Sequence, residues 1–176
     1  MSVFATINAL DRAGFLDAFG HVFEHSAWVM EGAWEHRPFA DEAALVAAMQ
    51  ASVDAAPEEL RLALLRAHPD LAGKAARAGD LTLDSYKEQT GAGLDRLSEE
   101  EYGRFHTMNE AYKAKFGFPF IIAVKGLNRN DILAAYATRL DNARPVEFET
   151  ALTQVKKIAG FRLADALAVI ANGKAA

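Results

Sequence analysis

The sequence predicts an all-α protein, and three observations lead to this prediction. Apolar residues recur at helical spacing along most of the chain. Residues that favour helix starts, such as Asp41 and Ser98, stand directly before these stretches. One stretch, 118–124, has the composition of a strand, but a single strand without a partner is not stable. We therefore expect residues 118–124 to form an extended, buried connection between two helices.

The first third of the chain is expected to hold four short helices. The first follows Asp11, a suitable N-cap residue, and its apolar positions are Phe15, Phe19, Val22 and Phe23. The other expected ranges are 26–35 after Ser26, 41–54 after Asp41, and 57–67 with Pro57 in the first turn.

The helix starts in the second half of the chain carry clearer sequence signals. Ser98 and Glu101 form the pattern of a capping box, which predicts a helix over 98–116. Two more helices are expected over 130–142 and 145–172, the second broken near Gly160 because glycine weakens a helix.

Length, charge and cysteine content restrict the class of protein. The 176 residues suffice for one hydrophobic core, and without a repeat or flexible linker we expect a single domain over residues 1–176. The net charge of −5 provides no basic field for nucleic acid. The absence of cysteine excludes disulfides and thiolate chemistry, and no apolar stretch is long enough to cross a membrane. We therefore expect a cytoplasmic protein that does not bind nucleic acid.

The segment His21-Val22-Phe23-Glu24-His25 matches the H-x-x-E-H pattern of one class of zinc protease. That chemistry needs a third protein ligand and a helix that continues past the second histidine. Ser26 instead predicts the start of a new helix directly after His25. A zinc hydrolase that uses His21 and His25 is therefore the less favoured alternative, and we expect no metal site.

His68 is the first candidate for proton transfer. Because Pro69 disfavours helical geometry in the residue before it, the His68 imidazole should lie at a helix boundary on stiff backbone. Histidine is the side chain best suited to move a proton near neutral pH. The structural alternative is a histidine that ends a helix by bonding a free carbonyl group.

Ser85, Glu88 and Gln89 form a second candidate group, since their spacing places them on one face of a helix. A capping box that starts at Ser85 would explain Ser85 and Glu88 without any chemistry. It would leave Gln89 unexplained, so both interpretations stay open.

Arg139 is the third candidate. It lies on the same side of its predicted helix as Ile132 and Tyr136, so its guanidinium should point toward the core. A buried charge needs a partner. That partner is either a carboxylate of the protein or a polar group of a ligand.

Four motifs stand out when the chain is taken as a whole. They are His68-Pro69-Asp70-Leu71-Ala72, Ser85-x-x-Glu88-Gln89-x-x-Ala92-Gly93-Leu94, Phe116-Gly117-Phe118-Pro119-Phe120-Ile121 and Arg139-Leu140-x-Asn142. Together they resemble one enzyme family, the 2-oxo-4-hydroxy-4-carboxy-5-ureidoimidazoline (OHCU) decarboxylases. Trp28-Val29, Arg37-Pro38-Phe39 and Arg162-Leu163 extend the resemblance over nearly the whole chain. The family catalyses the last step from urate to (S)-allantoin.

The resemblance implies a role for each motif. His68 and Glu88 would be the catalytic pair, and Pro69 would shape the turn that presents the imidazole. Ser85, Gln89 and Arg139 would hold the substrate. The backbone at Phe118, Phe120, Ile121 and Ile122 would contact its ring. The family is all-α, uses neither a metal nor an organic cofactor, and commonly forms homodimers.

The expected function is therefore the cofactor-independent decarboxylation of OHCU to (S)-allantoin and CO2. Besides the zinc hydrolase, one alternative is a helical partner-binding module without catalysis. Such a module would have an exposed apolar groove and no buried polar cluster.

Overall fold

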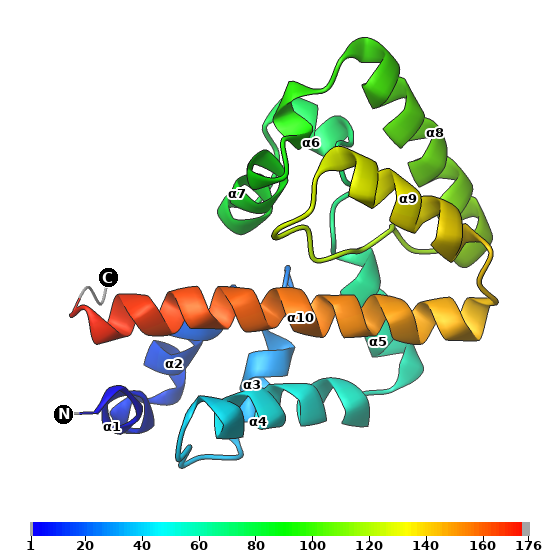
Figure 1. Ribbon diagram of the computed structural model, residues 1–176. Coiled ribbons are helices and arrows are strands. Elements are labelled where there is room, and N and C mark those ends of the chain that lie inside the picture. Colours follow the sequence, from blue (N-terminus) through cyan, green and yellow to red (C-terminus); the bar gives the residue numbers. More distant parts are fainter. Residues whose placement is uncertain (1, 174–176) are drawn as a thin grey trace. The chain divides into compact units, whose positions relative to one another are not determined.

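The computed structural model describes residues 2–173, and within this range ten α-helices and one short 3₁₀ helix form with no strand (Figure 1). The all-α prediction is confirmed. None of the helices described is long and apolar enough to span a membrane.

The chain falls into two compact units. The terminal unit holds the residues up to Ala67 together with those from Lys156 onward, and the central unit is His68–Val155. The single domain expected over 1–176 stays a prediction, and residues 1 and 174–176 lie outside the described residues.

The terminal unit contains the first five helices and the second half of the last. They are α1 (Val3–Ala9), α2 (Arg12–Phe19), α3 (Trp28–Trp34), α4 (Glu42–Ala55), α5 (Glu58–Arg66) and the later part of α10 (Arg144–Ala171). The predicted N-caps Asp11 and Asp41 are confirmed, since their carboxylates accept hydrogen bonds from Gly14 N and Ala44 N at 2.8 and 2.9 Å.

Three features of the terminal unit differ from the prediction. α1 was not expected, and α2 ends at Phe19, although Val22 and Phe23 beyond it are buried in a turn. At Val22 and Phe23 the apolar spacing correctly predicted burial, but it wrongly predicted helix. α10 continues through Gly160, so the predicted break is wrong. One glycine costs a helix only about 1 kcal/mol, and the buried neighbours of Gly160 offset that cost.

The three helices expected in the second half of the chain begin close to their predicted positions, whereas no helix was expected over 74–78 or 94–96. The central unit contains α6 (Lys74–Ala78), α7 (Leu83–Gly91), the 3₁₀ helix η1 (Leu94–Arg96), α8 (Glu99–Phe116), α9 (Arg129–Leu140) and the first part of α10. The Ser98–Glu101 capping box of α8 is confirmed. Asn128 and Asp131 form a second capping box, which starts α9 slightly earlier than expected.

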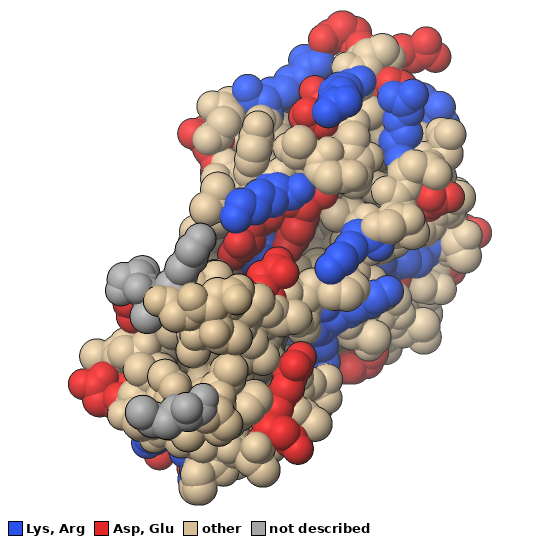
Figure 2. Space-filling model, turned by 60° about the vertical axis from the view of Figure 1, so that its left-hand side comes forward, with Lys and Arg blue, Asp and Glu red and all other residues tan. Residues whose placement is uncertain are grey.

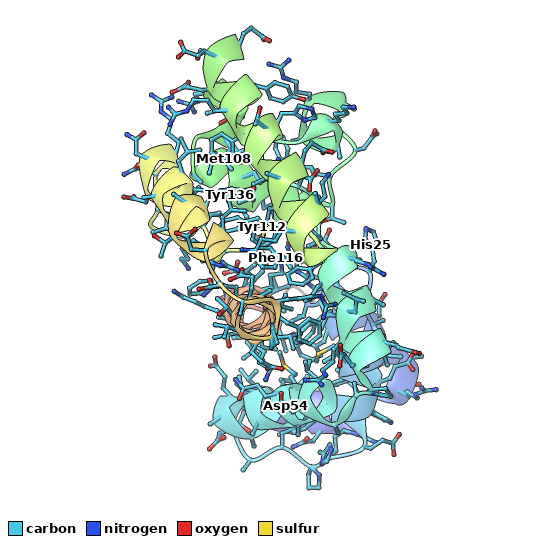
Figure 3. All side chains as sticks on the ribbon, turned by 90° about the vertical axis from the view of Figure 1, so that its right-hand side faces the viewer. His25, Asp54, Met108, Tyr112, Phe116 and Tyr136 are labelled. Atoms are coloured by element: carbon cyan, nitrogen blue, oxygen red, sulfur yellow. The ribbon has the colours of Figure 1, made fainter. Side chains whose placement is uncertain are left out.

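Aromatic side chains form the core of the central unit. Tyr112 and Phe116 of α8 and Tyr136 of α9 lie between these two helices (Figure 3). Phe118 and Phe120 of the extended segment 118–124 pack edge-on against Tyr112. The segment has no regular secondary structure and is largely buried, as predicted.

Charged side chains of both signs share the surface. Lys and Arg side chains lie next to Asp and Glu side chains over much of the face shown in Figure 2. Ion pairs of the central unit include Arg77 with Glu99 at 2.7 Å and Arg129 with Glu101 at 3.1 Å. Exposed pairs of this kind add little stability, but they keep positive and negative charges interspersed on the surface.

Candidate active site

The residues predicted to act on a substrate all lie in the central unit. They belong to three stretches: the loop 68–73, which we call the His68 loop, the helix α7, and the extended segment 118–124 with Arg139 beside it.

His68 lies outside any helix, as Pro69 predicts. α5 ends at Arg66, Ala67 is its C-cap, and the His68 loop follows without regular structure. The His68 side chain is buried, with 9% of the residue exposed, and Pro69 is half-buried. A histidine held in non-helical backbone and shielded from bulk water is well placed to exchange a proton with a bound molecule.

Side chains of α7 and α8 hold the backbone of the His68 loop. Gln89 Oε1 accepts a hydrogen bond from Ala72 N at 2.9 Å, and Gln89 Nε2 donates to Asp70 O at 3.5 Å. Asn109 Nδ2 donates to Leu71 O at 2.9 Å. Buried side-chain amides thus take the place of a secondary-structure partner for three consecutive residues of the loop.

The His68 loop also contains an ion pair and a sharp backbone turn. Lys113 Nζ donates to Asp70 Oδ2 at 2.6 Å. Partial burial opposes the charge of Lys113, but its bonds to Asp70 and Glu110 outweigh this and raise its pKa. Ala72 has a left-handed backbone with φ of 50°, and a Cβ at Gly73 would lie 2.7 Å from Asp70 Cβ. The left-handed Ala72 therefore carries local strain that the hydrogen bonds of the loop must hold, whereas glycine at 73 avoids the close contact.

α7 presents the second group. Thr82 is its N-cap and accepts from Ser85 N at 3.3 Å, so the alternative of a capping box that starts at Ser85 is wrong. Ser85, Glu88 and Gln89 share one face, with Ser85 and Gln89 buried and Glu88 half-buried. Because Gln89 reaches the His68 loop, this face of α7 is turned toward the loop.

Arg139 has a carboxylate of the protein as its partner. Its Nε and Nη2 donate to Glu147 Oε1 at 2.8 and 2.5 Å, and Glu147 is fully buried. Asn142 Nδ2 donates to the other carboxylate oxygen at 2.7 Å. The structural alternative, a buried ion pair, accounts for the position of Arg139. Direct contact with substrate stays a prediction.

Arg139 and Glu147 also form hydrogen bonds with the extended segment and with α8. Arg139 Nη1 donates to Ile121 O at 2.7 Å, and its guanidinium lies 4.4 Å from the centre of the Phe120 ring. Tyr112 donates its hydroxyl hydrogen to Glu147, and burial together with this bond raises the pKa of Tyr112 well above its usual range. The extended segment is thereby tied to the helices around it.

The four residues of the extended segment that were predicted to contact substrate differ in which of their groups are available to a ligand. The Phe118 and Phe120 side chains belong to the aromatic core, which leaves only their backbone groups for a ligand. Ile121 O already accepts from Arg139, although a carbonyl oxygen can accept a second bond. Ile122 is half-buried, and next to it Ala123 N donates to Gln154 Oε1 at 3.1 Å.

Asn109, Tyr136 and Glu147 were not predicted to be functional. Tyr136 lies on the same side of its predicted helix as Ile132, but no polar role was expected of it. A polar side chain on an apolar stripe is itself a signal, because a buried amide or hydroxyl needs a partner. That signal predicts a hydrogen bond without naming the partner.

The zinc alternative finds no support in the terminal unit. Residues 21–25 form turns, His25 has a left-handed backbone, and its side chain is 70% exposed. Glu24 is buried and accepts from Arg162 Nη1 at 2.7 Å. Among residues 2–173 no group of three or more His, Cys, Asp or Glu side chains is placed to hold a metal ion.

One cavity of about 310 Å³ lies in the central unit and is bordered by α6, α7, η1 and α8. Its polar lining includes Arg77, Gln89, Thr90 and Tyr102. Gln89 is the one predicted site residue in this lining, so the cavity is not where the proposed catalytic groups meet.

Comparisons with known proteins agree on one family. The OHCU decarboxylase family model matches residues 8–164. OHCU decarboxylase of Haloferax volcanii is 45% identical over 159 residues, which are 90% of this chain and 92% of that protein. The human protein named a putative OHCU decarboxylase is 39% identical over 161 residues, 92% of this chain and 93% of the relative.

Solved structures of similar fold are also found. A crystal structure of (S)-allantoin synthase has a TM-score of 0.73 and 32% identity, over 93% of this chain and 53% of that chain. A crystal structure of OHCU decarboxylase in the presence of (S)-allantoin has a TM-score of 0.69 over 84% of this chain and 95% of that one; at 24% identity it supports the fold alone. With its motifs, its fold and these relatives, the chain belongs to the OHCU decarboxylase family.

Proposed function

We propose that the protein removes CO2 from OHCU and so forms (S)-allantoin. The observation that carries this proposal is the pair of hydrogen bonds from Gln89 to the His68 loop. They bring the two family motifs, His68-Pro69 and Ser85-x-x-Glu88-Gln89, to one place in the central unit. The buried polar side chains there also favour an enzyme over a binding module that lacks a polar cluster.

The chemistry needs no electron sink from the protein. When the bond between C4 and the carboxylate breaks, its electron pair forms a double bond between C4 and C5. The electrons of the neighbouring C=N bond move onto nitrogen, which takes up a proton. A second proton then adds to C5 while the C4 hydroxyl loses its proton and becomes a carbonyl. The protein must orient the substrate, exclude water and control these three proton transfers.

We assign these tasks to the predicted residues. His68 and Glu88 exchange the protons, and Pro69 holds the turn that presents the imidazole. Ser85 and the second Nε2 hydrogen of Gln89 bond the amide edges of the substrate. The backbone at Ile121 and Ile122 contacts the ring. For Arg139 the contacts with Glu147 and Ile121 O support an indirect role, in which it acts on the substrate through the extended segment.

The test is a chiral analysis of allantoin formed from freshly generated OHCU. Uncatalysed decay of OHCU gives racemic allantoin, so the wild-type protein should add both rate and an excess of the (S) enantiomer. His68→Ala should remain folded and lose about 10²- to 10⁴-fold in rate, because positioned proton transfer is typically worth that much. A wild-type protein that leaves the rate and the racemic product unchanged would contradict the proposal.

A homodimer and a cytoplasmic location belong to the same proposal. The resemblance to the family supports both, and the lack of cysteine fits a reducing compartment. Leu83 and Tyr86 lie on α7 with 67% and 53% of their surfaces exposed, and apolar side chains of this kind favour self-association. Sedimentation equilibrium tests the dimer, and a single monomeric species would rule it out.

A further inference from the structure

We infer that Asn109 and Tyr136 are positioning residues that connect the His68 loop to the extended segment. The inference rests on the proposed function, because it assigns these residues to the same site. Neither side chain reaches the surface, since Asn109 is 1% exposed and Tyr136 is fully buried. They act on the substrate through the two backbone stretches that they hold.

The first half of the connection runs from the loop to α9. Asn109 Nδ2 donates to Leu71 O at 2.9 Å, and Asn109 Oδ1 accepts the hydroxyl hydrogen of Tyr136. Leu71 O can only accept, so the amide NH2 group must face it and the amide oxygen is left for the hydroxyl. The asparagine can thus satisfy both partners in one orientation only.

The second half runs from α9 to the extended segment. The Tyr136 ring stacks on Phe120 with 3.6 Å between ring centres and 19° between the planes. Arg139, one turn later on α9, bonds Ile121 O at 2.7 Å. α9 therefore contacts two consecutive residues of the segment, while its Tyr136 hydroxyl holds the His68 loop through Asn109. Direct contacts connect Leu71 O to the segment without a gap.

A polar link in this core has a cost that apolar residues would avoid. Burying an amide and a hydroxyl is unfavourable unless every polar atom is bonded, whereas leucine and phenylalanine would fill the same space. What the polar pair adds is direction, since hydrogen bonds fix distance and orientation and apolar contacts do not. Burial and the nearby Asp70 charge raise the pKa of Tyr136 far above neutral pH, which keeps its hydroxyl a donor.

Two variants break the link with little change in volume. Tyr136→Phe keeps the stack on Phe120 but removes the hydroxyl, and Asn109→Asp replaces the donor that faces Leu71 O with an acceptor. Each should stay folded and lower kcat about 10- to 100-fold with a much smaller change in KM, because small misplacements of reacting groups reduce turnover. The double variant should lose less than the two single losses combined, because the residues act as a unit.

The (S) excess of the product is the second readout. It should fall in both variants even when extrapolated to high enzyme concentration, where uncatalysed decay no longer competes. Tyr102→Phe, the same substitution at a tyrosine of α8, and Leu133→Ala, a core truncation on α9, control for the lost hydroxyl and for lost stability. Both should keep the wild-type (S) excess. Folded Tyr136→Phe and Asn109→Asp with wild-type kcat and (S) excess would overturn the inference.

Hydrogen exchange separates this inference from the proposed function, since it needs no substrate. Tyr136→Phe should speed amide exchange in both 68–73 and 118–124, and Leu133→Ala should not affect the two stretches together. Faster exchange near α9 alone would overturn the link even if the wild-type protein makes (S)-allantoin. Joint faster exchange in a protein without decarboxylase activity would instead keep the link and remove the proposed function.

Discussion

The His68 loop and the extended segment 118–124 are two non-helical stretches of the central unit, and they are held in different ways. Polar side chains hold the loop: Gln89 and Asn109 bond its backbone, and Lys113 bonds Asp70. Aromatic burial holds the segment, with Phe118 and Phe120 in the core and one guanidinium on Ile121 O.

The difference follows from what each stretch has to present. The loop carries a side chain, His68, whose direction depends on the exact path of the backbone, and directional hydrogen bonds fix that path. In the proposed function the segment presents backbone groups, whose position follows once alternate side chains are anchored in a core. Three experiments on the central unit test this difference, and a fourth serves as a control in the terminal unit.

Glu147→Ala should cause the largest loss of stability. It leaves Arg139 buried without its carboxylate and removes the acceptor of the Tyr112 hydroxyl. Breaking a buried ion pair in this way typically costs about 3–5 kcal/mol. Urea unfolding measures the loss, and Glu147→Gln, which keeps acceptor and shape, should lose less. Equal stability of Glu147→Ala and wild type would show that the segment does not depend on this ion pair.

Gln89→Leu should affect stability less and turnover more. It leaves Ala72 N without its acceptor in a buried site, at a cost of about 1–3 kcal/mol. Because the His68 loop would then move relative to α7, kcat should fall about 10- to 100-fold. Gln89→Glu keeps an acceptor for Ala72 N and should recover part of the stability. A stable, fully active Gln89→Leu would contradict the hydrogen-bonded character of the loop.

Raising the pH above about 10 should gradually lower the stability that two tyrosines of the central unit contribute. Tyr112 and Tyr136 have pKa values raised above the ordinary value of 10, so the unfolded chain ionises them first. Their contribution to stability is fully present below about pH 10 and is lost above it, by about 1.4 kcal/mol per pH unit for each tyrosine. Thermal melts between about pH 8 and 12 should show this decline, and Tyr136→Phe should make it shallower. An unchanged slope would mean that Tyr136 ionises freely in the folded protein.

The smallest effect is expected in the terminal unit. His21→Ala combined with His25→Ala should leave decarboxylation and the melting temperature nearly unchanged, because the two histidines lie in a turn and His25 is exposed. Activity should also survive treatment with EDTA. A large loss of activity in either test would bring back the zinc alternative.

Features that depend on neighbouring residues could be predicted from the sequence. Asp41 and Ser98 start helices because their side chains bond amides within the next turn. Pro69 keeps His68 out of helix through a local clash. The buried, extended character of 118–124 followed from its composition and the lack of a second strand. The family resemblance rested on the same short motifs, so it too was available before the structure.

The contacts between groups far apart in the chain became clear only from the fold. Arg139 was expected to need a partner, but a buried charge does not say whether Glu147 or a ligand will supply it. Gln89 and Asn109 bond a loop that is 17 and 38 residues away along the chain. Val22 and Phe23 continued a helical pattern, yet their side chains are removed from water equally well by burial in a turn. Local propensity determines where a helix starts, whereas packing and hydrogen bonding across the fold determine what its side chains hold.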